Sequence, residues 1–257
     1  MGDEAQDDDD PEPGAGPVAG GGAAAASVRI KIEQRGDAIV VPVQLSGPRG
    51  ALAAKLVFDT GATFTTLDAA TLRRLGVAPS PVASDTDTAG GRVRRSLAVI
   101  EGAAIGAARV AGGLTVGVCE GCGGAGAVGL LGLNFTRHFV VTLDAQQGEL
   151  LLQPRAERTL AALSEIEPFV AFVETRTARE DGKLVISFSV ENRSPRLLRD
   201  LVVGAELQGA RGASFTGPPQ VRIAAVPAGG RVAARIEAPL AGSADEVATL
   251  ELRRAAW

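Results

Sequence analysis

Asp59 is the residue of this sequence best placed for catalysis. It follows the apolar residues 56–58 and precedes the small or polar residues Thr60, Gly61, Ala62 and Thr63. This order is typical of a buried strand that leads into a tight turn, where a carboxylate can donate or accept a proton. Taken alone, an aspartate after an apolar strand is more often a turn or capping residue, so the motif needs support from elsewhere in the chain.

That support comes from Leu130, Leu131 and Gly132, farther along the sequence. The two elements together resemble the Asp-Thr-Gly-Ala/Ser loop and the hydrophobic-hydrophobic-Gly element of retropepsin-like aspartic proteases. The resemblance is to bacterial single-domain members related to the Gag-polyprotein proteases. It covers about residues 28–153 and none of the rest.

The resemblance implies an aspartic endopeptidase that hydrolyses peptide bonds of a protein or peptide substrate. In this family two aspartates hold one water and share a proton, because two close carboxylates cannot both ionise. The sequence has a single Asp-Thr-Gly, so a homodimer would supply the second Asp59. No metal or organic cofactor is implied. The residues expected to support the site are Thr60, Gly61, Ala62, Thr63, Leu130, Leu131 and Gly132.

The family also has a flap, a hairpin that closes over the substrate. The Gly-rich tip Ala89, Gly90 and Gly91 falls at the corresponding place, between two expected strand arms. The tip has no aromatic residue. Nearby Arg92, Arg94 and Arg95 are expected on the solvated face of a strand.

The two cysteines, Cys119 and Cys122, have C-x-x-C spacing. Two thiols do not complete a zinc site, and the glycines after Cys122 disfavour the helix that a thioredoxin-like motif requires. A disulfide that tightens the loop, or two idle thiols, is the preferred interpretation, with redox or metal chemistry as the alternative.

Composition excludes other classes of function. The net charge is −4, and the basic residues are dispersed, which argues against a nucleic-acid partner. Hydrophobic residues make up 46% of the chain, yet no stretch of about 18 apolar residues could span a bilayer.

Residues 1–26 begin acidic, become rich in Gly, Pro and Ala, and predict a disordered tail. They lack a signal peptide, but such a linker often follows a removed signal or anchor, so export to the bacterial periplasm or envelope is a hypothesis.

The remaining pattern predicts an all-β protein in two domains. The resemblance implies a retropepsin-like acid-protease β-barrel over residues 27–153. The residue pattern predicts a linker at 154–167, helical over 156–166, and an immunoglobulin-like β-sandwich over 168–257. Its six strands are expected over 170–177, 184–190, 201–207, 221–225, 231–236 and 247–252. Asp68 should cap a helix that ends at Gly76, Asp144 should stabilise a hairpin turn, and His138 should lie on a short helix.

Two further hypotheses come from other classes of function. The first keeps the fold without catalysis and makes the chain a binding protein that acts through its C-terminal sandwich. The second is a redox module that uses Cys119 and Cys122. The role of residues 168–257 does not follow from their sequence.

Overall fold

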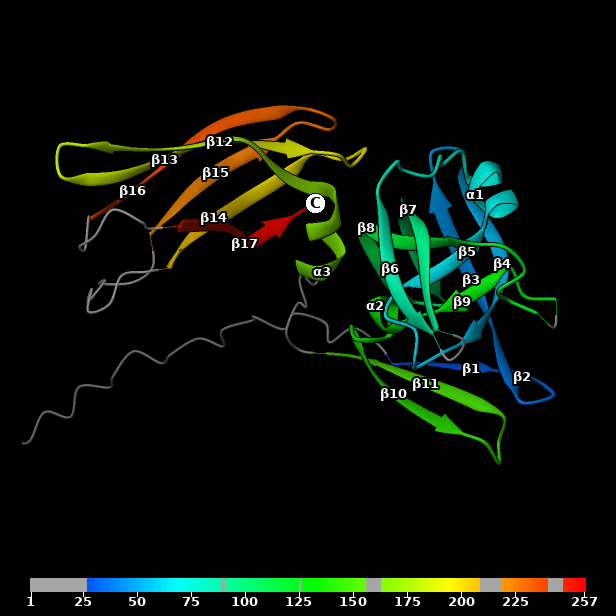
Figure 1. Ribbon diagram of the computed structural model, residues 1–257. Helices are drawn as coiled ribbons and strands as arrows, with labels where there is room; N and C mark the ends of the chain where they lie inside the picture. Colours follow the sequence, from blue (N-terminus) through cyan, green and yellow to red (C-terminus); the bar gives the residue numbers. More distant parts are fainter. Residues whose placement is uncertain (1–26, 89–90, 125, 156–162, 209–218, 240–246) are drawn as a thin grey trace, which may run out of the picture.

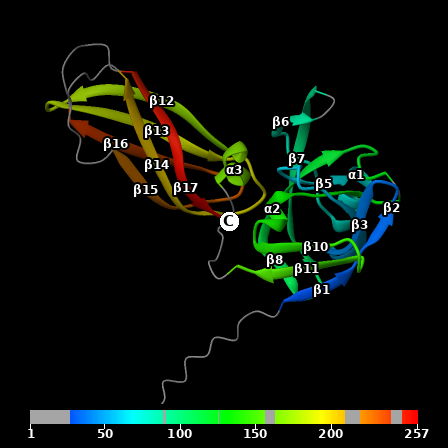
Figure 2. The ribbon, with the colours of Figure 1, turned by 90° about the horizontal axis from the view of Figure 1, so that it is seen from below.

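The structure is a computed structural model of the chain. It describes residues 27–88, 91–124, 126–155, 163–208, 219–239 and 247–257. Most of these residues are in β-strands, as predicted. We call residues 27–155 the N-terminal part and residues 163–257 the C-terminal part (Figures 1 and 2).

The N-terminal part contains two sheets. One has eight strands in the order β2-β3-β4-β9-β5-β8-β7-β6, and β3 also pairs with β7, so this sheet curls back on itself. The other has the order β1-β11-β10. The strands are β1 Val28–Lys31, β2 Glu33–Arg35, β3 Ala38–Gly47, β4 Gly50–Phe58, β5 Thr65–Asp68, β6 Ala83–Thr88, β7 Gly91–Ile105, β8 Ala108–Cys119, β9 Gly129–Leu131, β10 Phe139–Asp144 and β11 Glu149–Pro154. Two helices complete this part, α1 Ala69–Leu75 and α2 Leu133–Thr136.

Alternation along the strands explains which face of the large sheet is buried. In β3, Val41, Val43 and Leu45 are buried, whereas Pro42 and Gln44 between them are exposed. The buried face joins a hydrophobic core to which β4, β5, β8, β9 and α1 also contribute. Each such side chain gains about 1.5–3 kcal/mol from leaving water, so this core fixes the register of the strands.

Helix α1 forms as its sequence predicts. Asp68 is the N-cap, and its side chain accepts a hydrogen bond from the Thr71 amide at 2.6 Å. Gly76 ends the helix in the left-handed conformation with φ 77°, which favours glycine. Leu72 and Leu75 are buried on one face. The helix therefore follows β5 directly and packs its apolar face against the core.

The C-terminal part consists of two three-stranded sheets, with orders β12-β13-β16 and β15-β14-β17, which share a second hydrophobic core. All six strands were predicted. A short helix and a 3₁₀ turn precede them, and the elements are α3 Leu163–Ile166, η1 Glu167–Phe169, β12 Val170–Glu180, β13 Lys183–Asn192, β14 Leu198–Gln208, β15 Gln220–Val226, β16 Arg231–Pro239 and β17 Val247–Ala256. Residues 156–162 of the expected helical linker lie outside the described residues. The immunoglobulin-like topology and the domain bounds stay predictions.

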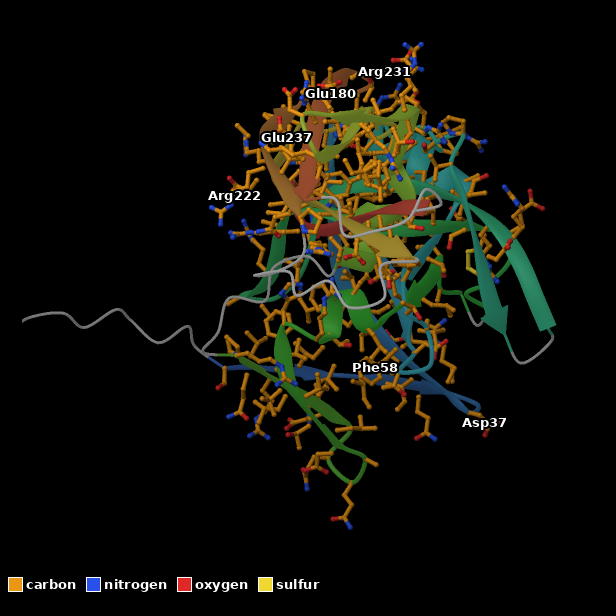
Figure 3. All side chains as sticks on the ribbon, turned by 60° about the vertical axis from the view of Figure 1, so that its left-hand side comes forward. Asp37, Phe58, Glu180, Arg222, Arg231 and Glu237 are labelled. Atoms are coloured by element: carbon orange, nitrogen blue, oxygen red, sulfur yellow. A yellow bond between two sulfur atoms is a disulfide. The ribbon has the colours of Figure 1, made fainter. Side chains whose placement is uncertain are left out.

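Exposed ion pairs link the strands of the sheet β12-β13-β16, and Figure 3 labels two of their carboxylates, Glu180 and Glu237. Arg235 contacts Glu180 at 2.8 Å and Glu237 at 3.2 Å, and Lys183 contacts Glu237 at 2.8 Å. Exposed pairs of this kind add about 0–1 kcal/mol each. These pairs therefore indicate that this face of the sheet is exposed to solvent, and they add little to the stability of the fold.

A small apolar cluster joins the two parts. Phe169 and Trp257 from the C-terminal part pack with Leu97 and Val99 of β7. The Phe169 and Trp257 rings meet edge to face, with centroids 5.8 Å apart. The sole tryptophan of the chain is thus a reporter of this contact.

Two expectations for single residues are wrong. Nε and Nη1 of Arg95 are buried and have no hydrogen-bond partner among the described residues, so this side chain is not on a solvated face. Two residues further along the same strand, Leu97 is covered by Phe169 and Trp257. The alternation of residues along the strand does not indicate this contact. His138 lies beyond the end of α2 at Thr136.

No helix in the described ranges is long and apolar enough to cross a membrane.

Candidate active site

The pairing of three strands places Asp59 at the start of its loop. Strand β4 runs parallel to β9, with Phe58 opposite Leu131, and β9 pairs with β5 on its other edge. The Asp59 amide extends the first ladder by donating to the Leu131 carbonyl at 3.1 Å. Residues 59–64 therefore form a loop between two strands that are both held by β9, the element that contains Leu130 and Leu131.

The loop turns tightly around the Asp59 carboxylate. The Gly61 amide donates to Asp59 Oδ1 at 2.8 Å, and the Ala62 amide donates to the Asp59 carbonyl at 3.4 Å. A Cβ on Gly61 would lie 3.3 Å from the same Oδ1. Asp59 and Ala62 are half-buried, whereas Thr60, Gly61 and Thr63 are exposed. The carboxylate is thus oriented by its own loop, and the loop reaches the surface of the single chain.

Gly132 crosses directly beneath this loop. A Cβ at Gly132 would lie 2.5 Å from the Phe64 carbonyl carbon and 2.7 Å from the Thr65 nitrogen, closer than real Cβ atoms approach. Just beyond the crossing, the Leu133 amide donates to the Ala62 carbonyl at 2.8 Å. Only a residue without a side chain fits here, and the loop is held from below by backbone hydrogen bonds.

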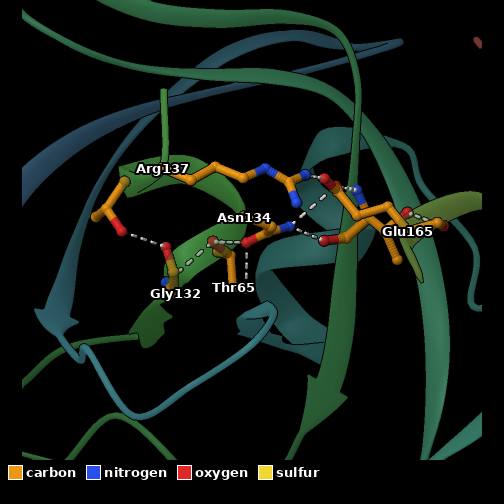
Figure 4. Close-up of polar contacts among 7 residues, drawn as sticks. Thr65, Gly132, Asn134, Arg137 and Glu165 are labelled. Atoms are coloured by element: carbon orange, nitrogen blue, oxygen red, sulfur yellow. Dashed lines mark hydrogen bonds and ion pairs between the residues drawn. The ribbon is translucent and has the colours of Figure 1, made fainter. Parts of the chain in front are cut away.

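A buried polar pair, Asn134 and Thr65, fastens the far end of the loop (Figure 4). Asn134 Oδ1 accepts from the Thr65 amide at 2.7 Å and from the Thr65 hydroxyl at 2.9 Å. Thr65 Oγ1 in turn accepts from the Gly132 amide at 3.2 Å. Neither residue was predicted from the sequence to support the site. The sequence signal that could have identified Asn134 is its position as a polar residue between the apolar residues Leu133 and Phe135.

The flap candidates lie at the end of a long hairpin. Strands β6 and β7 pair from Ala83 opposite Ser96 to Thr88 opposite Gly91. Gly91 begins β7 with φ 110°. Ala89 and Gly90, the other two expected residues of the tip, lie outside the described residues. The two strand arms are present, and the role of the hairpin stays a prediction.

Cys119 and Cys122 form a disulfide. Cys119 ends β8 opposite Asp68, and Cys122 Sγ lies 3.3 Å from the hydroxyl of Thr66 in β5. Thr66 Oγ1 also accepts from the Leu130 amide at 3.2 Å. The disulfide constrains the start of the connection from β8 to β9, next to the strands that hold Asp59. No group of three or more possible metal ligands occurs within the described ranges.

His138 is half-buried and follows α2. Burial lowers the pKa of its imidazole, and the charge of neighbouring Arg137 lowers it further. Burial in the fold therefore favours the neutral imidazole. Asp144, the other polar residue singled out, accepts a hydrogen bond from the Gln147 amide at 2.9 Å and stabilises the β10–β11 turn as predicted.

Comparison with known proteins agrees with the predicted resemblance. Residues 41–135 match the family model of aspartyl proteases, a range that includes both the Asp59 loop and Gly132. The match supports the aspartic-protease resemblance of this part of the chain. A solved retropepsin-like aspartic protease from Rickettsia conorii is similar to this chain, with 18% sequence identity and a TM-score of 0.37. The matched region covers 49% of this chain and 91% of the Rickettsia chain. No curated protein matches the chain.

Proposed function

We propose that the chain is an aspartic endopeptidase that is active as a homodimer, in which Asp59 of each copy contributes one half of the catalytic dyad. The observation that carries the proposal is the Asp59 loop itself. Its carboxylate accepts from the Gly61 amide, and the loop is crossed from below by Gly132. The match to aspartyl proteases over residues 41–135 supports peptidase chemistry in general.

The chemistry follows from bringing two such carboxylates together. Two close carboxylates share one proton, and their two apparent pKa values belong to the pair. The ionised member takes a proton from a bound water, which attacks the peptide carbonyl, while the protonated member donates to the carbonyl oxygen. The Gly61 amide holds the Asp59 carboxylate in place through its hydrogen bond to Oδ1.

The need for a second copy rests on the sequence and on the position of the loop. The chain has a single Asp-Thr-Gly. Thr60 and Gly61 are exposed, and Leu133, whose amide holds the Ala62 carbonyl, is a large hydrophobic residue with 42% of its surface exposed. An exposed apolar residue beside the catalytic loop fits a two-fold contact between copies. The hairpin β6–β7, whose arms pair as far as Thr88 and Gly91, would then close over the substrate.

The test compares cleavage of a peptide library by the wild type and by the Asp59→Asn variant. The substitution keeps the size of the side chain and its acceptor oxygen for Gly61, so the fold should persist while cleavage is lost. Asp144→Asn, in a hairpin turn, is the matched control and should cleave like the wild type. Equal cleavage by the wild type and Asp59→Asn would contradict the proposal. Peptide binding without cleavage by either protein would favour the inactive binding scaffold.

A further inference from the structure

A carboxylate from the C-terminal part is buried inside the N-terminal part. Glu165 lies in α3, next to Ile166, which belongs to the C-terminal core. Its own side chain reaches the other way, between β8 and α2 (Figure 4), and only 1% of the residue is exposed. A buried charge is costly unless it is paired and hydrogen-bonded, so its partners indicate why it is tolerated there.

The partners of Glu165 come from two elements of the N-terminal part. Oε2 accepts from the Thr115 amide of β8 at 3.3 Å and from Asn134 Nδ2 of α2 at 3.2 Å. Oε1 forms an ion pair with Arg137. The Thr115 hydroxyl donates to the Glu165 backbone carbonyl at 2.9 Å. Both the charge and the backbone of α3 are therefore matched by the N-terminal part.

These contacts complete the hydrogen bonding of Asn134, the residue that fastens the catalytic loop. Its Nδ2 donates to Glu165 and, at 2.7 Å, to the Thr115 carbonyl, while its Oδ1 accepts twice from Thr65. A carboxylamide offers two donors on one side and an acceptor on the other. The Glu165 carboxylate and the Thr115 carbonyl are both acceptors beside Nδ2, so a reversed amide would lose two hydrogen bonds there. Glu165 therefore acts together with Thr115 in setting which atom of Asn134 faces Thr65.

The orientation of Asn134 matters for the loop that contains Asp59. A reversed amide would present N–H donors to the Thr65 amide, and two donors cannot bond. Thr65 begins β5 directly after the loop, and its hydroxyl also accepts from the Gly132 amide beneath the loop. Loss of the Thr65 contact would thus release both the end of the loop and the Gly132 segment that supports it.

We propose that Glu165 is a positioning residue for the catalytic loop, through which the C-terminal part holds Asn134, Thr65 and Gly132 in the arrangement that orients Asp59. Glu165 touches neither substrate nor the reacting atoms. The catalytic consequence rests on the proposed function, whereas the structural consequence does not. The C-terminal part thereby becomes a component of the active site's support.

The first experiment measures hydrogen exchange in the full-length protein and needs no activity. Glu165→Ala removes every side-chain contact of Glu165 and leaves Asn134 Nδ2 with the Thr115 carbonyl alone. Exchange of the Thr65 amide should become about tenfold faster or more, because Asn134 is then held less firmly against Thr65. Amides of the β13–β16 ladder, such as Ile186 and Ile236, should keep wild-type exchange. Glu167→Gln, exposed two residues further on, is the control.

The second experiment measures cleavage kinetics. In Glu165→Ala, kcat should fall about tenfold or more with KM within about twofold, because the dyad is misplaced while the substrate contacts remain. Glu165→Gln retains an oxygen that can accept from Asn134, and should recover part of the loss. Trp257 fluorescence tells a displaced loop from a detached C-terminal part, since Trp257 packs against Phe169 and Leu97.

The outcomes separate the two proposals. If Glu165→Ala does not fold, the same measurements are made on Glu165→Met, which keeps the length of the side chain but offers no acceptor to Asn134. Wild-type exchange at Thr65 in the folded variant would overturn the positioning role, as would a loss of kcat that only follows the fraction of unfolded protein. If the wild type cleaves no peptide, the proposed function fails, and the exchange experiment still tests the link from Glu165 to Thr65.

Discussion

Replacing Gly132 by alanine tests the close crossing beneath the catalytic loop. The new Cβ would lie 2.5 Å from the Phe64 carbonyl carbon, 2.6 Å from its oxygen and 2.7 Å from the Thr65 nitrogen. All three atoms are backbone, so no flexible side chain can move aside. The backbone of Gly132 has φ −93° and ψ −178°, a conformation open to any residue. The cost of the substitution is therefore steric and not conformational.

The size of the effect follows from the overlap. Ordinary carbon contacts are about 3.5–4.0 Å, so the loop must move by about 1 Å to admit the methyl group. Overpacking of this kind costs about 1–3 kcal/mol, and about 3 is expected where only backbone can yield. That corresponds to a fall in Tm of about 6–12 °C, at about 2–4 °C per kcal/mol for a chain of this size. A displacement of about 1 Å at Asp59 should also lower kcat about 100-fold.

Thermal unfolding and peptide cleavage measure the two effects. Gly148→Ala is the control, because its φ is 60° and no atom lies within 4 Å of the added Cβ. It should lose about 1 kcal/mol from its left-handed backbone and keep wild-type cleavage. Wild-type stability and activity in Gly132→Ala would refute the crossing.

Three further predictions concern stability. Asp68→Ala removes the N-cap contact to the Thr71 amide and should lower the free energy of unfolding by about 1 kcal/mol without changing the activity per folded molecule, as measured by denaturant titration and cleavage. Because burial lowers the pKa of His138, its neutral form is favoured in the fold, and this stability is present above the unfolded pKa of about 6.5 and is lost as the pH falls through the folded value. His138→Gln should therefore lose less stability than the wild type between pH 7 and pH 5, and parallel pH profiles of Tm would contradict this. Arg95→Met removes two buried nitrogen atoms that have no partner among the described residues, so Tm should match or exceed that of the wild type, and a fall of several degrees would show that Arg95 is satisfied in solution.

Local sequence signals predicted much of the fold. Asp68 and Gly76 mark the two ends of α1 because capping depends on residues next to the helix. The six strands predicted after residue 168 are present as well, because strand patterns and turn residues are also local signals. The positions of Asp59 and Gly132 relative to each other came from a resemblance, since no local rule pairs β4 with β9.

The parts that were missed depend on contacts between distant segments. Asn134 and Glu165 are 31 positions apart, and nothing in the neighbourhood of either residue indicates that they meet inside one polar cluster. Arg95 reads as a surface residue because strand alternation does not say which segment another part of the chain covers. Phe169 and Trp257 cover the neighbouring Leu97, and that packing follows from the three-dimensional arrangement alone.

The most direct test of the central claim mixes two kinds of subunit. Wild type and Asp59→Asn are unfolded together in equal amounts, refolded, and assayed for cleavage at the same total protein concentration. If the active site needs Asp59 from both copies, random pairing leaves about one quarter of the dimers with a complete dyad, and activity should be about one quarter of the wild-type value. Activity of about one half would show that each chain works with its own Asp59, and would contradict a dyad shared across the dimer.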